Sequence, residues 1–115
     1  MEFKLNKVIW CLVGFLFTNP VLSSQEKGKI HRFLINKTIP NAVILNVIST
    51  EEPTKPECVG GWEWVIDIST ETGKAMYSLA LSMYMADKEI VIAGMGTCDD
   101  SLYASGEVVR YIYPN

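Results

Sequence analysis

Short apolar segments separated by polar turns make up most of the chain from residue 29 onward. Residues 62–68, WEWVIDI, alternate most clearly, so that Trp62 and Trp64 are expected on the same side. This alternation is typical of a strand with one buried face. Four further segments are rich in branched and aromatic residues, which favours strands; they are residues 29–35, 42–48, 89–94 and 107–113. The pattern therefore predicts five strands.

A change of period predicts one helix between the third and fourth strands. No proline or glycine interrupts residues 74–88, and apolar side chains recur there with the spacing of a helix face. Ser69 or Thr70 can cap this helix, and Glu71 would lie in its first turn, where a negative charge suits the dipole. The predicted buried face consists of Ala75, Met76, Leu79, Ala80 and Met83.

The order of these elements indicates a mostly β protein. Five strands with one helix between the third and fourth strands is the connectivity of the OB-fold, a small five-stranded barrel. An open α+β sheet with the helix on one face is the alternative. We expect residues 24–115 to form a single domain of this kind.

Residues 1–23 have the pattern of a secretory signal peptide. Lys4 and Lys7 precede the apolar run VIWCLVGFLF, and small residues follow up to Ser23. The run is shorter than the roughly 20 apolar residues that span a bilayer. We therefore expect a secreted or periplasmic protein without a membrane span, cleaved after Ser23 or Ser24.

The cysteine count predicts one disulfide. Cys11 lies in the expected signal peptide, which leaves Cys58 and Cys98. An even number of cysteines in an oxidising compartment indicates pairing, which the chain-entropy treatment values at roughly 4 kcal/mol for a loop of this size. The chain has one histidine and no Cys-x-x-Cys spacing, so we expect no metal and no cofactor.

The stretch GMGTCDD, residues 94–100, contains two glycines that suggest a phosphate-binding loop. Such a loop must lead into a helix N-terminus, whereas this stretch lies between two predicted strands. We expect a turn here. The formal net charge of −3 also disfavours a nucleic-acid partner, which is bound by clustered Lys and Arg.

Five side chains in or near the predicted loops are candidates for ligand contact: Trp62, Glu63, Asp99, Asp100 and Tyr103. Aromatic rings supply flat contact area, and carboxylates accept hydrogen bonds from hydroxyl groups. Alternatively, Trp62 belongs to the core and the two aspartates form a solvated turn, since two carboxylates are too few for calcium. No strained nucleophile turn and no paired-acid signature is present. We therefore expect no enzyme, with a small hydrolase using His31 or Asp99 as a further alternative.

The predicted helix is also apolar outside its buried face, where it carries Tyr77, Leu81, Tyr84 and Met85. A helix that is apolar over most of its circumference is usually covered on two sides. These four residues are therefore candidates for an interface between copies of the chain. The alternative is that methionine and tyrosine tolerate partial exposure.

The segment KAMYSLALSMYMADKEIVIAGMGTC and the short ECVGGW resemble the secreted bacterial B subunits of the subtilase-cytotoxin and typhoid-toxin type. The resemblance covers roughly residues 58–113. It implies an OB-fold, a ring of five copies, and binding of cell-surface glycans to deliver a separate catalytic A subunit. Those B subunits carry more cysteines, and their glycan-contacting residues have no counterpart here, so no binding residue is transferred.

These observations together predict a non-enzymatic, toxin B-subunit-like protein that binds host glycans as part of a homo-oligomer. The alternative is a monomeric secreted or periplasmic OB-fold protein that binds another protein, as an inhibitor or envelope factor.

Overall fold

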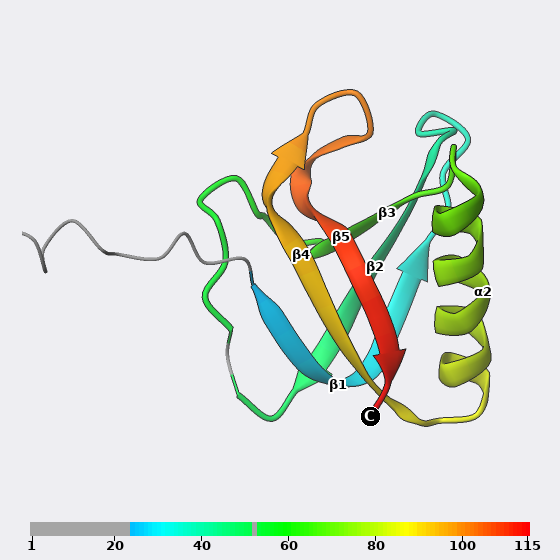
Figure 1. The fold of residues 1–115 in the computed structure, drawn as a ribbon. Coiled ribbons are helices and arrows are strands. Elements are labelled where there is room, and N and C mark those ends of the chain that lie inside the picture. The colour runs from blue at the N-terminus through cyan, green and yellow to red at the C-terminus, as the bar shows by residue number, and fades with distance from the viewer. Residues whose placement is uncertain (1–23, 52) are drawn as a thin grey trace, which may run out of the picture.

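The computed structural model describes residues 24–51 and 53–115; the predicted signal peptide lies outside the described residues. These described residues form five strands and one helix (Figure 1). They are β1 (Gln25–Leu34), β2 (Ala42–Ser49), β3 (Trp64–Asp67), α2 (Glu71–Met85), β4 (Glu89–Asp99) and β5 (Tyr103–Pro114). The prediction of a mostly β chain with one helix is confirmed.

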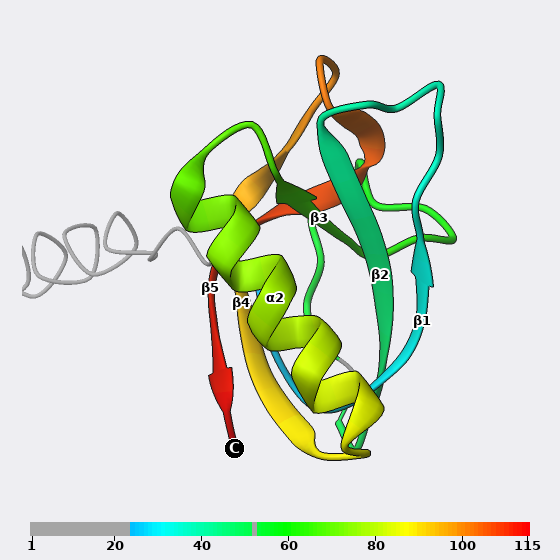
Figure 2. The same cartoon turned by 90° about the vertical axis from the view of Figure 1, so that its right-hand side faces the viewer.

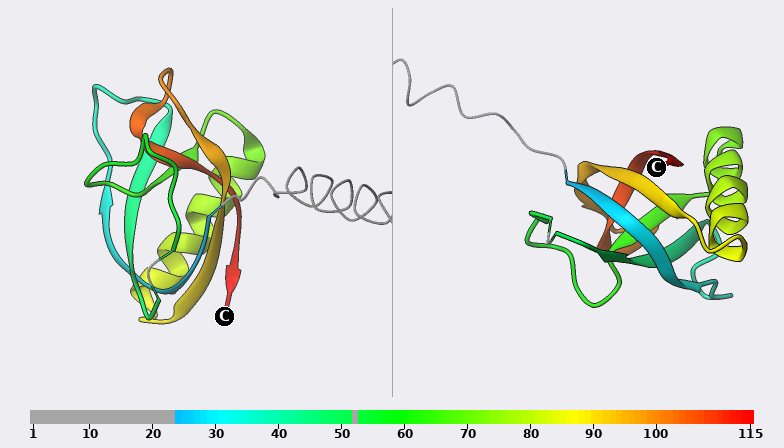
Figure 3. Two further views of the ribbon diagram at one scale, coloured as in Figure 1. Left: turned by 90° about the vertical axis from the view of Figure 1, so that its left-hand side faces the viewer. Right: turned by 90° about the horizontal axis from the view of Figure 1, so that it is seen from below.

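The strands form a closed barrel in the order β1-β2-β3-β5-β4, and β4 pairs with β1 to close it. The pair β3–β5 is parallel and the other pairs are antiparallel. Because the sheet is closed, the open α+β alternative is excluded. Helix α2 packs across one side of the barrel, as Figure 2 shows. The long connection between β2 and β3 lies on the opposite side, which is clear from below in Figure 3.

Both faces of β2 and β3 are buried over most of their length, although Ile48 near the end of β2 is 61% exposed. Inward side chains such as Leu45, Trp64 and Ile66 form the main core, onto which α2 packs Met76, Leu79, Ala80 and Met83. A second cluster lies on the other face of the same strands. It consists of Ala42, Ile44 and Val65, covered by Leu34, Ile39, Trp62, Leu102 and Tyr103. Continuous apolar runs in both strands are therefore explained by burial from two sides.

Helix α2 begins and ends three residues earlier than predicted. Thr70 caps it by accepting a hydrogen bond from the Gly73 backbone N–H at 2.9 Å. Gly73 is buried, and only glycine fits there because a Cβ would collide with the Asp67 carbonyl group. The prediction that Ala75 is buried is wrong. Two residues beyond Gly73, Ala75 points about 200° around the helix, toward solvent.

The prediction that GMGTCDD is a turn is also wrong. Strand β4 continues through this stretch to Asp99, and its pairing with β5 shifts register between Gly94 and Cys98. Gly96 has φ 80°, a backbone conformation that glycine adopts without strain. The glycines thus form an irregularity inside a strand, and the turn itself is confined to residues 100–102.

Cys58 and Cys98 form the predicted disulfide, with their Cα atoms 6.3 Å apart. The bond joins the β2–β3 connection to β4. A disulfide fits an extracellular or periplasmic protein. In the two described ranges, no helix has both the length and the apolarity needed to cross a membrane.

Candidate functional site

Four charged side chains meet at the side of the barrel that lies away from α2: Glu26, Lys55, Glu63 and Glu107, which we call the charged mouth. Glu26 is the second residue of β1 and is only 3% exposed, and Glu107 of β5 is fully buried. Glu107 lies opposite Trp64 in the parallel β3–β5 pair. Barrel closure thus brings carboxylates from distant parts of the chain into one place.

Lys55 lies at the centre of the charged mouth. Its Nζ is 3.5 Å from the centre of the Trp64 ring and 3.6 Å from one oxygen of each of Glu26 and Glu63. The Trp64 Nε1–H donates a hydrogen bond of 2.7 Å to Glu26, which fixes that carboxylate beside the indole. The ammonium group therefore rests on an aromatic face between two carboxylates.

Glu107 is held in place by backbone hydrogen bonds. Its Oε2 accepts hydrogen bonds from the backbone N–H of Gly96 at 2.9 Å and of Ser24 at 3.4 Å. The carboxylate occupies the space that a Cβ at Gly94 would need, which accounts for glycine at that position. Within residues 24–51 and 53–115, Glu107 Oε1 and Lys55 Nζ are buried without a hydrogen-bond partner.

The charged mouth holds three carboxylates and one ammonium group, and burial shifts two of their pKa values. Burial raises the pKa of Glu63, and the like charge of Glu26 adds to this effect, while Lys55 opposes it. Burial lowers the pKa of Lys55, and this lowering is opposed by Glu26, Glu63 and Glu107, which each raise the pKa. No three His, Cys, Asp or Glu side chains of the described ranges are arranged to hold a metal ion.

We expect the raised pKa of Glu63 to appear in the pH dependence of stability. An acid whose folded-state pKa is raised contributes stability that is complete below its unfolded pKa and is lost as pH rises through the folded value. The free energy of unfolding of the wild type should therefore fall relative to that of Glu63→Gln as pH rises from the ordinary value of 4.5. Urea unfolding at intervals from about pH 2 to pH 8 measures this difference.

Asp99 provides a control of opposite sign. Its pKa is lowered because the Ser101 side chain and backbone donate hydrogen bonds to its carboxylate. The wild type should therefore gain stability relative to Asp99→Asn as pH rises toward 3.8, and this gain should be complete above 3.8. Equal slopes for the two variants would contradict the expected shift at Glu63.

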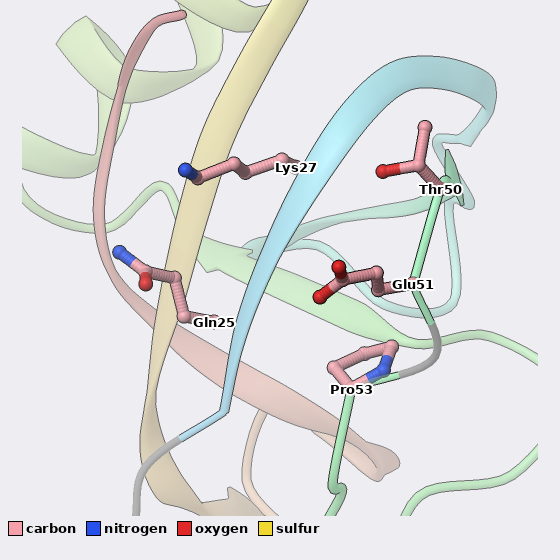
Figure 4. Close-up of a pocket in the computed structure, with 5 residues that line it drawn as sticks. All are labelled: Gln25, Lys27, Thr50, Glu51 and Pro53. Atoms are coloured by element: carbon pink, nitrogen blue, oxygen red, sulfur yellow. The ribbon is translucent and has the colours of Figure 1, made fainter.

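Two neighbouring pockets flank β1 near the charged mouth. One, of about 450 Å³, reaches the mouth itself and is lined by Glu26, Val47, Ser49, Thr50, Pro53, Lys55 and Glu63. The other, of about 340 Å³, is lined by Gln25, Lys27, Thr50, Glu51 and Pro53 (Figure 4). We call the second one the outer pocket. Both have a volume in the range of small-molecule sites.

An exposed pair of tyrosines lies beside the outer pocket. The rings of Tyr111 and Tyr113 stack with centroids 5.8 Å apart, and the residues are 39% and 46% exposed. Gln25, which lines the outer pocket, donates a hydrogen bond of 3.1 Å from Nε2 to the Tyr111 hydroxyl group. The outer pocket and this tyrosine pair therefore adjoin each other across β4, which lies between β1 and β5.

The five ligand candidates from the sequence lie in different places. Trp62 and Tyr103 pack against the second cluster, and the Arg32 guanidinium carbon lies 4.3 Å from the Trp62 ring centre. The prediction that Trp62 shares a face with Trp64 is wrong, because the chain enters the strand only at Trp64. Glu63 belongs to the charged mouth.

The two aspartates lie at the β4–β5 turn. Asp99 accepts hydrogen bonds from the Ser101 backbone N–H at 2.8 Å and from its hydroxyl group at 2.6 Å. Asp100 is exposed at the start of the turn. Asp99 therefore has a local structural role, since these hydrogen bonds hold the turn.

The four interface candidates on α2 differ in exposure. Leu81, Tyr84 and Met85 are 38%, 41% and 76% exposed, whereas Tyr77 packs against the core. Phe33 of β1 makes edge-to-face contacts with both Tyr77 and Tyr84, at centroid distances of 5.9 and 5.3 Å. Three of the four side chains are therefore available at the surface of the chain.

The charged mouth and the tyrosine pair are not apparent from the sequence. Glu26 lies in the polar segment QEKGK, which has the composition of a surface segment. The alternation of the tyrosines in YIY, residues 111–113, is the one local signal that two aromatic rings share a face.

Comparison of the chain with protein-family models, with curated proteins and with solved structures gave no match. A function for this chain must therefore be argued from the geometry of its own residues.

Proposed function

We propose that the chain is a non-enzymatic, exported OB-fold protein of the toxin B-subunit-like type that binds carbohydrate. The closed order β1-β2-β3-β5-β4, with a helix between β3 and β4, supports the OB-fold assignment. The resemblance of residues 58–113 to secreted B subunits agrees with it.

The observation that carries the proposal is the outer pocket beside the tyrosine pair. Sugars present hydroxyl groups at their edges and C–H groups on their faces. The outer pocket offers the Gln25 amide, the Thr50 hydroxyl group and the Glu51 carboxylate for the hydroxyl groups. The tyrosine pair offers exposed aromatic area for a sugar face.

Lys27 suggests which glycans fit. Its side chain extends from β1 across β4, beside that of Gln25 (Figure 4). An exposed ammonium group at this position favours a glycan that carries a carboxylate, such as a sialylated one. Glycans with a negative charge are therefore expected to bind more tightly than neutral glycans.

A single shallow site of this kind binds weakly, and assembly compensates for it. The exposed Leu81, Tyr84 and Met85 give α2 an apolar surface suited to contact with another copy. Linked weak sites gain on the order of 10²–10⁴ in avidity. A ring of five that carries a separate catalytic A subunit is the assembly that the resemblance implies.

The proposal predicts that Tyr111→Ala lowers glycan binding by at least about tenfold, which corresponds to about 1.4 kcal/mol. Lys27→Ala should reduce binding of sialylated glycans more than binding of neutral ones. A glycan array probed with the purified chain, followed by calorimetry on the best ligand, measures both effects. Lys37→Ala is the matched control because Lys37 is an exposed lysine in the β1–β2 turn, outside the outer pocket.

Two outcomes would contradict the proposal. One is absence of binding to both sialylated and neutral glycans, and the other is equal binding by the wild type and Tyr111→Ala. Light scattering after size exclusion tests the assembly separately. A mass of one chain would remove the ring and favour the monomeric, protein-binding alternative.

A further inference from the structure

We propose that the charged mouth is a binding site for a primary alkylammonium group, and that Lys55 occupies this site from within the chain. The proposal goes beyond carbohydrate binding and does not involve the tyrosine pair. The two can therefore fail independently.

The first argument is the chemistry around the Lys55 ammonium group. Nζ lies 3.5 Å from the centre of the buried Trp64 ring and 3.6 Å from one carboxylate oxygen of each of Glu26 and Glu63. An aromatic face combined with carboxylates is the arrangement that proteins use to bind ammonium ligands. The site therefore recognises the end of an alkylammonium chain, whichever molecule supplies it.

The second argument is that the site is built on rigid elements and does not depend on Lys55. Glu26, Trp64 and Glu107 lie on β1, β3 and β5 and are each at most 3% exposed. The Trp64–Glu26 hydrogen bond and the Gly96–Glu107 hydrogen bond hold two of the carboxylates in place. Lys55 comes instead from the β2–β3 connection, so its side chain can be removed while its binding site stays.

The third argument is that Lys55 leaves the site incompletely satisfied. Glu107 Oε1 is fully buried and lacks a hydrogen-bond partner among the described residues. Lys55 Nζ is likewise without an acceptor within hydrogen-bond distance. The site therefore contains acceptor oxygens that Lys55 does not reach within hydrogen-bond distance.

The pocket of about 450 Å³ supplies the access route. Glu26, Lys55 and Glu63 all line it, so a ligand entering there meets the carboxylates directly. A ligand ammonium group would replace that of Lys55 on the Trp64 ring, or would bind beside it.

Titration of Lys55→Ala with n-butylammonium chloride tests the proposal. The variant should bind the ion at least about tenfold more tightly than it binds n-butanol, which has the same chain but no charge. The readouts are the NMR shift of the Trp64 Nε1–H signal and the rise in Tm. Sodium chloride at equal ionic strength controls for salt. Lys37→Ala removes an exposed lysine outside both pockets and should bind n-butylammonium no more tightly than the wild type does.

The wild type is titrated in parallel, and it should respond only at concentrations about tenfold or more higher, because Lys55 competes for the same site. If Lys55→Ala does not fold, the wild-type titration decides. A Trp64 shift produced by n-butylammonium but not by n-butanol supports the site. Equal responses to the amine, the alcohol and sodium chloride would overturn it.

Discussion

Replacing Trp64 with alanine will lower the free energy of unfolding by about 3–5 kcal/mol. Trp64 is fully buried in the main core, so its removal leaves a cavity at the centre of the barrel. The change also removes the hydrogen-bond donor to Glu26 and the aromatic face under Lys55, which leaves two buried charges less well solvated. Denaturation in guanidinium chloride measures the loss.

Two variants separate the effect of the lost ring from that of the lost hydrogen-bond donor and test the central position of Trp64. Trp64→Phe retains an aromatic ring but loses the Nε1–H donor. It should lower the free energy of unfolding by less than Trp64→Ala does. Trp62→Ala is the matched control, since Trp62 is only partly buried and packs against the second cluster. If Trp62→Ala lowers the free energy of unfolding as much as Trp64→Ala does, the assignment of Trp64 to the centre of the core is wrong.

Replacing both Cys58 and Cys98 with serine is the second change with a large expected effect, a loss of about 2–5 kcal/mol. The disulfide joins the β2–β3 connection to β4 across a sequence separation of 40. Without the disulfide, the unfolded chain has more conformational entropy, and the β2–β3 connection is held to the barrel by fewer interactions. One of these is the hydrogen bond from the Gly60 N–H to the Ser105 carbonyl oxygen at 2.7 Å. Thermal unfolding of the double variant measures the effect.

Reduction of the wild type provides the control for this prediction. With dithiothreitol, the wild type should approach the stability of the double variant, whereas the double variant should not respond. A mass spectrum of the unreduced wild type should show no free thiol at residue 58 or 98. Equal stability of the wild type and the double variant would show that the bond does not contribute.

The element types followed from local patterns, whereas the element ends did not. Alternation and branched residues located the strand cores, because these features depend on neighbouring residues. Strands β4 and β5 are longer than predicted, since their pairing continues from Cys98–Glu107 to Asp99–Tyr103. That extension depends on pairing with a partner strand. The glycines of GMG, residues 94–96, instead indicated a turn, because glycine is common in turns.

The candidate site was predictable only in part. The disulfide followed from the cysteine count, and the burial of Trp64 followed from alternation. The charged mouth was not predictable from the sequence. Glutamate and lysine are usually solvated, and a local pattern gives no reason to bury them.

The sequence by itself determined which segments form strands or a helix, which two cysteines pair and which large apolar residues are buried. Each depends on local periodicity or on counting. The tertiary structure alone decided that Glu26 and Glu63 lie beside Lys55, that Glu107 is buried, and that Tyr111 adjoins the outer pocket. These groups belong to separate strands or connections, and only closure of the barrel, with β4 paired to β1 and β3 to β5, brings them together.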